Sequence, residues 1–178
     1  MKLILVGFMG VGKTTIGKIL AKKLNMEFID LDEEVEKIES KSIEDIFEFH
    51  GEKYFRNLEN KILKKVISKD NIIISTGGGV LKTNENYNLL KNEKNIIFLD
   101  ANVDTIINNL SSNQNEINKR PILRNSKDIY ITINNLLNER YKKYVDVSSI
   151  HIDTNGKNVD EVVSQILVYN RYYMILYW

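Results

Sequence analysis

The stretch GFMGVGKT, residues 7–14, decides the fold of this chain. It matches the pattern G-x-x-x-x-G-K-[ST], in which glycines let the backbone turn so that its N–H groups face phosphate oxygens. A short apolar run, residues 2–6, comes directly before it and reads as a buried strand. After it, Ile16, Leu20 and Leu24 recur at helical spacing. This strand–loop–helix order predicts a binding site for a nucleoside triphosphate, whereas a plain strand–turn–helix is the structural alternative.

The residue types in the loop suit phosphate chemistry. The side chain of Lys13 is expected to reach the β- and γ-phosphates, and the hydroxyl of Thr14 to bind Mg²⁺. The helix that begins near Lys13 adds the positive end of its dipole. The residues predicted to contact the nucleotide are Gly10, Val11, Gly12, Lys13, Thr14 and Thr15.

The rest of the chain alternates strands with helices. Apolar runs predict further strands at 27–32, 71–75, 95–99 and 147–152, and helical spacing predicts helices at 33–49, 53–68, 83–91, 103–110, 129–144 and 159–169. Such alternation is typical of a parallel sheet covered on both faces. We therefore expect an α/β three-layer sandwich with a five-stranded parallel sheet. Because no Pro/Gly/Ser-rich linker interrupts it, residues 1–178 are expected to form one domain.

Composition narrows the function classes. The chain has 178 residues, of which 43% are hydrophobic and 28% charged, so it is not largely disordered. With 25 Lys+Arg against 24 Asp+Glu, no basic field indicates a nucleic-acid partner. Cysteine is absent, which excludes disulfides and suits a reducing compartment. No apolar run approaches the ~18 residues of a membrane span. We expect a cytoplasmic monomer.

Two aspartates end the second predicted strand. Asp30 and Asp32 are two residues apart, so on a strand they point to the same face, at the edge where ligands bind in α/β sheets. Asp30 is a candidate for holding Mg²⁺, and Asp32 for binding or deprotonating an attacking hydroxyl. The structural alternative is that Asp32 caps the helix that follows.

Arginine is scarce here, since five of the 25 basic residues are Arg, so each Arg is a candidate for a planar, forked contact. Arg56 has Glu59 three residues on, which can fix its guanidinium for a substrate carboxylate. Arg120 ends a polar stretch with lid character and is a candidate for the ATP phosphates. Arg140 can supply a second anion contact. Each can instead be a solvated surface residue.

Three consecutive glycines follow the third predicted strand. Gly77, Gly78 and Gly79 permit a close backbone approach and expose N–H donors to a substrate. The two histidines, His50 and His151, have no paired ligands nearby and are assigned structural roles. The aromatic run at 168–178 is interpreted as packing on the domain, with self-association as the alternative.

The motifs in this order resemble the shikimate kinases. They are GFMGVGKTTIG at 7–17, FIDLD at 28–32, SIEDIF at 42–47, GEKYFRNLE at 51–59, STGGG at 75–79, RPIL at 120–123 and RY at 140–141. The resemblance implies ATP-dependent phosphorylation of the 3-hydroxyl of shikimate, with Mg²⁺, in the route to chorismate and aromatic amino acids. It also implies a fold similar to nucleoside monophosphate kinases, with a substrate-binding segment at about 32–60 and a lid at about 111–124.

The resemblance also implies roles for single residues. Lys13, Asp32 and Arg120 would be catalytic, with Asp32 binding the acceptor hydroxyls and taking the proton. Arg56 and Arg140 would hold the shikimate carboxylate, together with Gly78. The remaining members of the substrate set are Phe47 and Phe55, which would wall the ring.

One departure bears on the nucleotide site. Family members often carry another arginine just before the lid, where residues 108–112 of this chain have none. Two other functions stay open at this point: a related kinase of a gluconate-type substrate, and a nucleotide-binding module without transfer chemistry. The latter would need neither Asp32 nor Arg56.

Overall fold

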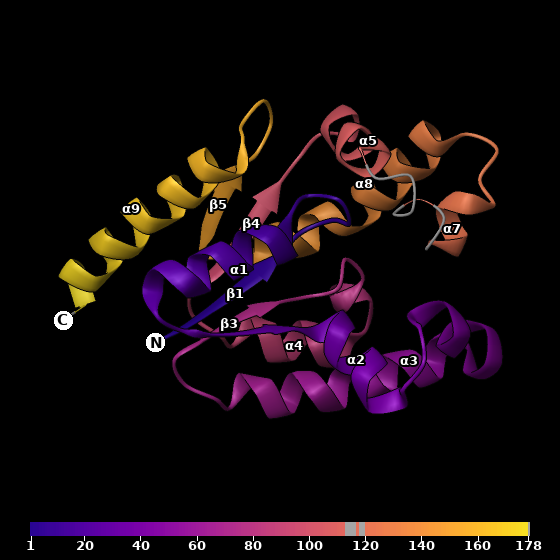
Figure 1. Ribbon diagram of the computed structural model, residues 1–178, viewed down its shortest axis with the longest axis horizontal. Helices are drawn as coiled ribbons and strands as arrows, with labels where there is room; N and C mark the ends of the chain where they lie inside the picture. The colour runs from indigo at the N-terminus through magenta and orange to yellow at the C-terminus, as the bar shows by residue number, and fades with distance from the viewer. Residues whose placement is uncertain (113–116, 118–119, 178) are drawn as a thin grey trace.

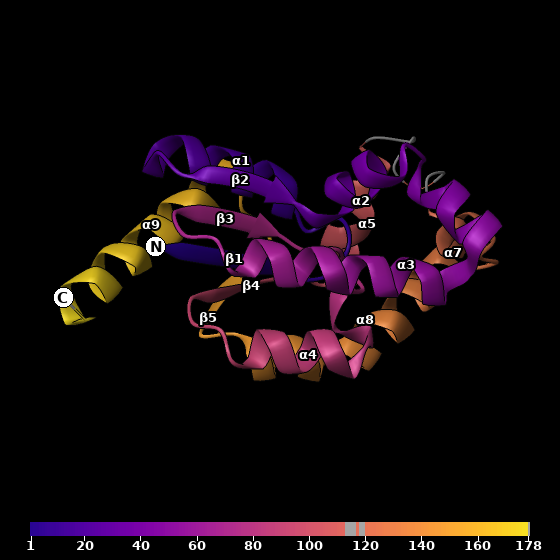
Figure 2. The ribbon, with the colours of Figure 1, turned by 90° about the horizontal axis from the view of Figure 1, so that it is seen from below.

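Five parallel strands form one sheet in the order β2-β3-β1-β4-β5, as expected for this α/β fold. The structure is a computed structural model that describes residues 1–112, 117 and 120–177, with side chains given up to 169 apart from that of residue 121. Figure 1 shows the strands side by side with helices in front and behind, and Figure 2 shows the same layers from below. The strands are β1 (Lys2–Val6), β2 (Glu27–Asp30), β3 (Ile72–Ser75), β4 (Ile96–Asp100) and β5 (Ile150–Asp153).

The helices follow the strands along the chain. They are α1 (Lys13–Leu24), α2 (Leu31–Glu39), α3 (Ile43–Ile67), the 3₁₀ turn η1 (Val80–Lys82), α4 (Asn84–Lys91), α5 (Val103–Ser111), α7 (Pro121–Arg124), α8 (Ile129–Val147) and α9 (Val159–Tyr177). None of the helices in the described part of the chain combines the length and apolar character that crossing a bilayer requires.

Alternate residues of the strands supply two apolar cores, one on each face of the sheet. Leu3 and Leu5 of β1 face a core shared with α1, α5 and α9. Ile4 and Val6 face the other core, shared with α2, α3 and α4. The carboxyl ends of the strands, between these layers, are where the phosphate-binding loop leaves β1.

Helix α8 contributes to both cores. Ile133 and Leu137, in its first half, pack in the core with α1, α5 and α9. Tyr144 and Val147, in its second half, pack in the core with α3 and α4. The helix therefore runs past the carboxyl ends of the strands from one side of the sheet to the other, and it carries Arg140 between the two halves.

Several boundaries differ from the sequence prediction, and the first of them lie between β2 and α3. Strand β2 ends at Asp30, so Asp32 lies in the first turn of α2 and not on the strand. The cap of α2 is Asp30, whose side chain accepts from the Asp32 N–H, so the capping alternative placed on Asp32 is wrong. The helix expected over 33–49 is broken at 40–42, because Ser42 caps a new helix by accepting from Asp45 N–H.

The expected gap between the helices at 33–49 and 53–68 is also different. Helix α3 runs through it, and the interruption is reduced to a kink at Gly51, whose φ of 78° and ψ of 169° are not helical. Helix α8 extends to Val147, so β5 begins at Ile150 and not at 147. Helix α9 continues to Tyr177, but the side chains of the aromatic run beyond 169 lie outside the described residues. Most of the polar stretch at 111–118 lies outside them too.

Candidate active site

The phosphate-binding loop takes the backbone shape that its glycines allow. Gly7, Gly10 and Gly12 have φ values of 147°, 79° and 87°, a region that side chains disfavour. A Cβ on Gly7 would also lie 2.5 Å from the carbonyl oxygen of Leu99. Gly12 stands at the N-cap of α1, so the first N–H groups of that helix face the cleft beyond the carboxyl ends of the strands. The predicted nucleotide residues, from Gly10 to Thr15, all line this cleft of about 1230 Å³.

Lys13 is buried within the loop that it follows. Its Nζ donates to the carbonyl oxygens of Gly7, at 2.9 Å, and Phe8, at 2.8 Å. Burial lowers the pKa of the amine to about 8, while the charges of Asp32 and Asp30 act in the opposite direction. A bound phosphate would favour the charged form of Lys13, so this part of the cleft suits an anionic ligand.

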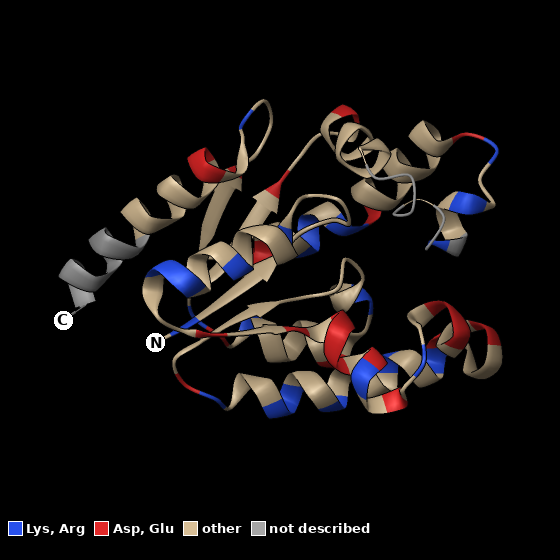
Figure 3. Cartoon of the chain, in the orientation of Figure 1, with Lys and Arg blue, Asp and Glu red and all other residues tan. Residues whose placement is uncertain are grey.

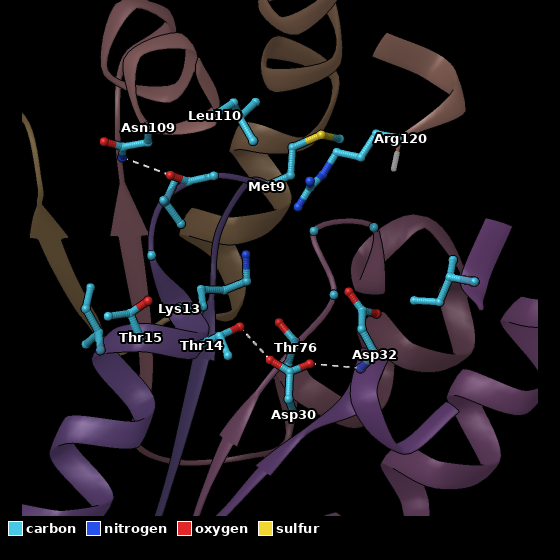
Figure 4. A pocket seen from close by; sticks show the side chains of 18 of the residues that line it. Met9, Lys13, Thr14, Thr15, Asp30, Asp32, Thr76, Asn109, Leu110 and Arg120 are labelled. Atoms are coloured by element: carbon cyan, nitrogen blue, oxygen red, sulfur yellow. Dashed lines mark hydrogen bonds between the residues drawn. The ribbon is translucent and has the colours of Figure 1, made fainter. Parts of the chain in front are cut away.

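Thr14 and Asp30 form a pair of hard oxygen ligands below the loop. Thr14 Oγ1 donates to Asp30 Oδ2 at 2.6 Å, and the other oxygen of Asp30 accepts from Asp32 N–H at 3.0 Å (Figure 4). Magnesium takes oxygen ligands and is commonly bound by one or two protein groups together with substrate phosphates and water. This donor set fits Mg²⁺, although no group of three or more His, Asp or Glu side chains suited to a metal occurs among the described residues.

Asp32 is a buried carboxyl with a perturbed affinity for protons. Burial, together with the nearby charges of Asp30 and Glu59, raises its pKa to about 7, against the opposite effect of Lys13 and Arg56. Figure 4 shows its carboxyl pointing up into the cleft from the start of α2. A carboxyl with a pKa near 7 can take a proton from a hydroxyl at neutral pH and release it afterwards.

Arg56 is held by two glutamates of its own helix. Its Nη1 lies 3.0 and 2.9 Å from the two carboxylate oxygens of Glu59, and its Nε lies 3.3 Å from Glu52 Oε1. Glu52 also accepts from Lys82 Nζ at 2.6 Å. The Arg56–Glu59 pair predicted from their spacing is therefore present, and it is partly buried in the cleft wall and not a solvated surface pair.

The three glycines after β3 make room for three different parts of the site. A Cβ on Gly77 would lie 2.6 Å from Asp32 Oδ1, and one on Gly79 would lie 2.5 Å from Arg56 Nη2. A Cβ on Gly78 would lie 2.8 Å from the backbone nitrogen of Met9, in the phosphate-binding loop. None of the three has a positive φ, so close approach, and not backbone conformation, is what excludes side chains here.

Arg140 enters the cleft from α8. It is 7% exposed, its Nη1 donates to Gly78 O at 3.1 Å, and its guanidinium lies 5.5 Å from the ring centre of Phe8. Its buried Nε has no hydrogen-bond partner within the described chain. Tyr144, one turn further on α8, also donates to Gly78 O, at 2.5 Å. A buried guanidinium with an unused donor is suited to an anionic ligand.

Two aromatic rings and the segment that leads into α7 complete the cleft. Phe47 and Phe55 pack at 4.8 Å between ring centres, and both line the cleft. Figure 4 shows Arg120, which directly precedes α7, extending toward the phosphate-binding loop, and its charge lowers the pKa of Lys13. Arg124 of α7 forms an ion pair with Glu44 of α3, so α7 touches the helix that carries Arg56.

Two amide side chains of α5 line the cleft next to the phosphate-binding loop. Asn108 and Asn109 line it, and Asn109 Nδ2 donates to Gly10 O at 2.8 Å. A Cβ on Gly10 would lie 2.9 Å from Leu110 Cγ, so α5 packs directly against the loop. Helix α5 therefore forms part of the cleft wall beside the phosphate-binding loop.

The histidines lie away from the cleft. His50 Nε2 lies 3.2 Å from Lys41 Nζ on the surface. His151 Nε2 lies 2.9 Å from Asp100 Oδ2, and its ring stacks on Phe98.

Acidic side chains gather on α2 and the first half of α3, whereas lysines follow along the second half of α3 (Figure 3). Arg56 therefore places a cation in an otherwise acidic part of the cleft wall.

Sequence reasoning missed several residues that shape the site. Glu52 and Lys82 extend the ion-pair network of Arg56, and Tyr144 shares the Gly78 carbonyl with Arg140. Asn86 contacts Glu59 from α4. No local pattern marks these residues, because each meets its partner only through the packing of separate elements. Glu52 alone had a signal, since it stands four residues before Arg56 on the same helix.

Comparison with known proteins agrees with this geometry. A family model described as shikimate kinase matches residues 9–170. A shikimate kinase of Clostridium botulinum (strain Eklund 17B) is 42% identical over 165 residues, which cover 93% of this chain and 94% of the relative. The chain belongs to the shikimate kinase family. The resemblance stated from the motifs is thereby confirmed, as is the α/β fold with a five-stranded parallel sheet.

Solved structures place the fold in the same family. A shikimate kinase from Acinetobacter baumannii, in complex with shikimate, is 30% identical with a TM-score of 0.88, and the match covers 97% of this chain and 93% of that chain. A gluconokinase from Sinorhizobium meliloti is 12% identical with a TM-score of 0.56, covering 97% of this chain and 96% of that one, and this likeness shows the fold alone. As a member of the shikimate kinase family, the chain is an ATP-dependent kinase and not a binding module without transfer chemistry.

Proposed function

We propose that this chain transfers the γ-phosphoryl group of ATP to the 3-hydroxyl of shikimate, with Lys13, Asp32 and Arg120 as its catalytic residues. The observation that carries the assignment is the meeting of three features in one cleft: a phosphate-binding loop, a buried carboxyl with a pKa near 7, and two guanidiniums beyond it. Family membership supports the reaction, and the geometry supports the residue roles.

The transfer needs a base, an acceptor and a place for negative charge. Asp32 takes the proton of the acceptor hydroxyl, whose oxygen attacks the γ-phosphorus as the bond to the β–γ bridging oxygen breaks and ADP leaves. Lys13 and Arg120 stand on the phosphate side, where their positive charges stabilise the transferred group and the leaving ADP. Positioning and electrostatics supply most of the catalysis in such a transfer.

Thr14 and Asp30 would hold Mg²⁺ beside the phosphates. When bound, the ion neutralises charge on the β- and γ-phosphate oxygens. Apart from the ion, Asp30 also fixes the start of α2 through the Asp32 N–H, so the same carboxylate that would bind the metal orients the segment that carries the base.

The acceptor is held by charge at one end and by rings along its side. Arg56 and Arg140 converge on the cleft from α3 and α8, and both suit the forked contact that a carboxylate makes. Phe47 and Phe55 offer an apolar wall to a six-membered ring. We assign residues 32–60 as the substrate-binding segment and 111–124 as the lid, because Glu44 and Arg124 join the two at the rim of the cleft.

The proposal is tested by ADP release and by calorimetry. Turnover of ATP is expected to depend on shikimate and Mg²⁺, with gluconate giving only background. With a non-hydrolysable ATP analogue present, Arg56→Lys is expected to weaken shikimate binding, because lysine keeps the charge but loses the fork. Shikimate methyl ester is the matched control: the variant should bind it about as well as the unaltered protein does. Turnover with gluconate and none with shikimate would refute the assignment.

A further inference from the structure

A buried asparagine stands behind the Arg56–Glu59 pair. Asn86, on α4, is 0% exposed. Its Nδ2 donates to Glu59 Oε2 at 3.2 Å, and its Oδ1 accepts from Asn60 Nδ2 at 2.8 Å. Because a carboxylate can only accept, the amide group of Asn86 has to face Glu59, and its oxygen is left for Asn60. Both ends of the side chain are thus used, in a fixed orientation.

Glu59, the carboxylate that Asn86 contacts, is buried and has few hydrogen-bond donors around it among the described residues. Glu59 is 0% exposed, and burial raises its pKa, which favours the neutral acid. Arg56 Nη1 donates to both carboxylate oxygens of Glu59. Among the described residues, Asn86 Nδ2 is the donor that reaches Glu59 from another element. A donor to the charged form acts against this effect of burial. The other charged groups facing Glu59 are Glu52 and Lys82, together with Asp32.

The orientation of Arg56 depends on that carboxylate. The hydrogen bonds of Arg56 to described residues use Nε, to Glu52, and Nη1, to Glu59. Its Nη2 lies beside Gly79 at the cleft. With two of the three nitrogens tied back, the direction of the third is set by where Glu59 stands.

We propose that Asn86 is a positioning residue for substrate recognition: through Glu59 it fixes the guanidinium of Arg56 so that Nη2 faces the acceptor carboxylate. Asn86 lies behind Glu59 and is not part of the described lining of the cleft, so it acts without touching substrate. This inference rests on the proposed function, in which Arg56 binds that carboxylate.

A purely structural role for the side chain has less support. The start of α4 depends on Thr83, whose Oγ1 accepts from the backbone N–H of Asn86 at 3.3 Å. That contact survives any substitution of Asn86 other than proline. The amide side chain of Asn86 therefore makes its hydrogen bonds to Glu59 and Asn60, and it does not cap its own helix.

The test compares Asn86→Leu and Asn86→Asp with Asn88→Leu and Asn88→Asp, which change an exposed position on the same helix. Leucine has the same number and branching of side-chain heavy atoms but no donor, and aspartate adds a negative charge beside Glu59. For Asn86→Leu we expect KM for shikimate to rise roughly tenfold, as for a lost hydrogen bond to a charged group, with KM for ATP within about twofold. Asn86→Asp should raise it further, and the Asn88 variants should leave both constants unchanged.

A double-mutant cycle separates action through Glu59 from any other cause. In a Glu59→Gln background, Asn86→Leu should add less than about twofold to KM for shikimate. A full tenfold addition, or an equal rise in KM for ATP, would overturn the proposal. If Asn86→Leu does not fold, Asn60→Leu is measured instead, and it should raise KM for shikimate in the same direction by a smaller factor.

The failure of this inference is distinguishable from failure of the proposed function. If the unaltered protein does not bind shikimate in calorimetry, the proposed function fails. If it binds shikimate and the folded Asn86 variants bind it equally well, only the role of Asn86 is refuted.

Discussion

Replacing Gly79 by alanine adds one methyl group at the point where Arg56 enters the cleft. The backbone of Gly79 has φ −110° and ψ 9°, which alanine adopts without strain. The new Cβ would lie 2.5 Å from Arg56 Nη2 and 3.1 Å from both Cζ and Nη1. The perturbation is therefore a steric one, directed at a single side chain.

The size of the effect follows from what holds Arg56. To reach an ordinary contact distance, Nη2 has to move by roughly 1 Å. The guanidinium cannot move as a whole without stretching the bonds of 2.9 and 3.0 Å from Nη1 to Glu59. The displaced guanidinium then loses one hydrogen bond to the substrate carboxylate, which costs about 1.5–3 kcal/mol of binding and corresponds to a rise of roughly ten- to a hundredfold in KM for shikimate.

The assay is coupled ADP release with shikimate and ATP varied in turn. We expect Gly79→Ala to raise KM for shikimate, to leave KM for ATP within about twofold and to change the melting temperature little, since no strained backbone is created. Gly51→Ala is the contrasting variant: nothing lies within 4 Å of its new Cβ, but its φ of 78° is strained, so it should lower the melting temperature. An unchanged KM for shikimate in Gly79→Ala, or an equal rise in an Arg56→Lys background, would refute the steric argument.

Three further outcomes are expected. The pKa of about 7 at Asp32 predicts that kcat/KM falls as the pH drops below 7, and Asp32→Asn should lower kcat by roughly 10²–10⁴. Because the folded state binds this proton more tightly than the unfolded chain does, the free energy of unfolding falls as the pH rises from about 4 to 7. Asp32→Asn should therefore raise the melting temperature at pH 8 but not at pH 4. Arg140→Lys removes the forked guanidinium that contacts Gly78 O, and it should raise KM for shikimate in kinetics, or Kd in calorimetry, about tenfold. An unchanged affinity for shikimate would contradict the role of Arg140. Thr14→Ala should raise the Mg²⁺ concentration needed for half-maximal rate about tenfold, while Thr14→Ser restores it; equal Mg²⁺ titrations for both would remove Thr14 from the metal site.

The sequence was most informative where local pattern and chemistry coincide. The apolar runs predicted all five strands, and GFMGVGKT predicted a glycine-shaped loop at the start of α1. The spacing of Arg56 and Glu59 predicted an ion pair that the structure contains. These features depend on neighbours within a few residues of one another, which is the range over which a sequence pattern carries information.

Boundaries and long-range contacts were less accessible. The acidic run after Asp30 reads as one long helix, and the cap of Ser42 on Asp45 breaks it. The predicted strand ran two residues too far and wrongly included Asp32, since Asp30 caps α2. The meeting of Arg140 with Gly78, and of Asn86 with Glu59, depends on how α8 and α4 pack, which no local spacing encodes.

The strand order has a consequence for synthesis on the ribosome. The central strand β1 is made first, yet its neighbours β3 and β4 are made only at residues 72–75 and 96–100, and Arg140 later still. Until β4 is made, a nascent chain carries a mostly apolar strand with at least one unpaired edge, which favours aggregation. Chains truncated before β4 should therefore need a chaperone to remain dispersed, and the kinase can be assembled only when nearly the whole chain has left the exit tunnel.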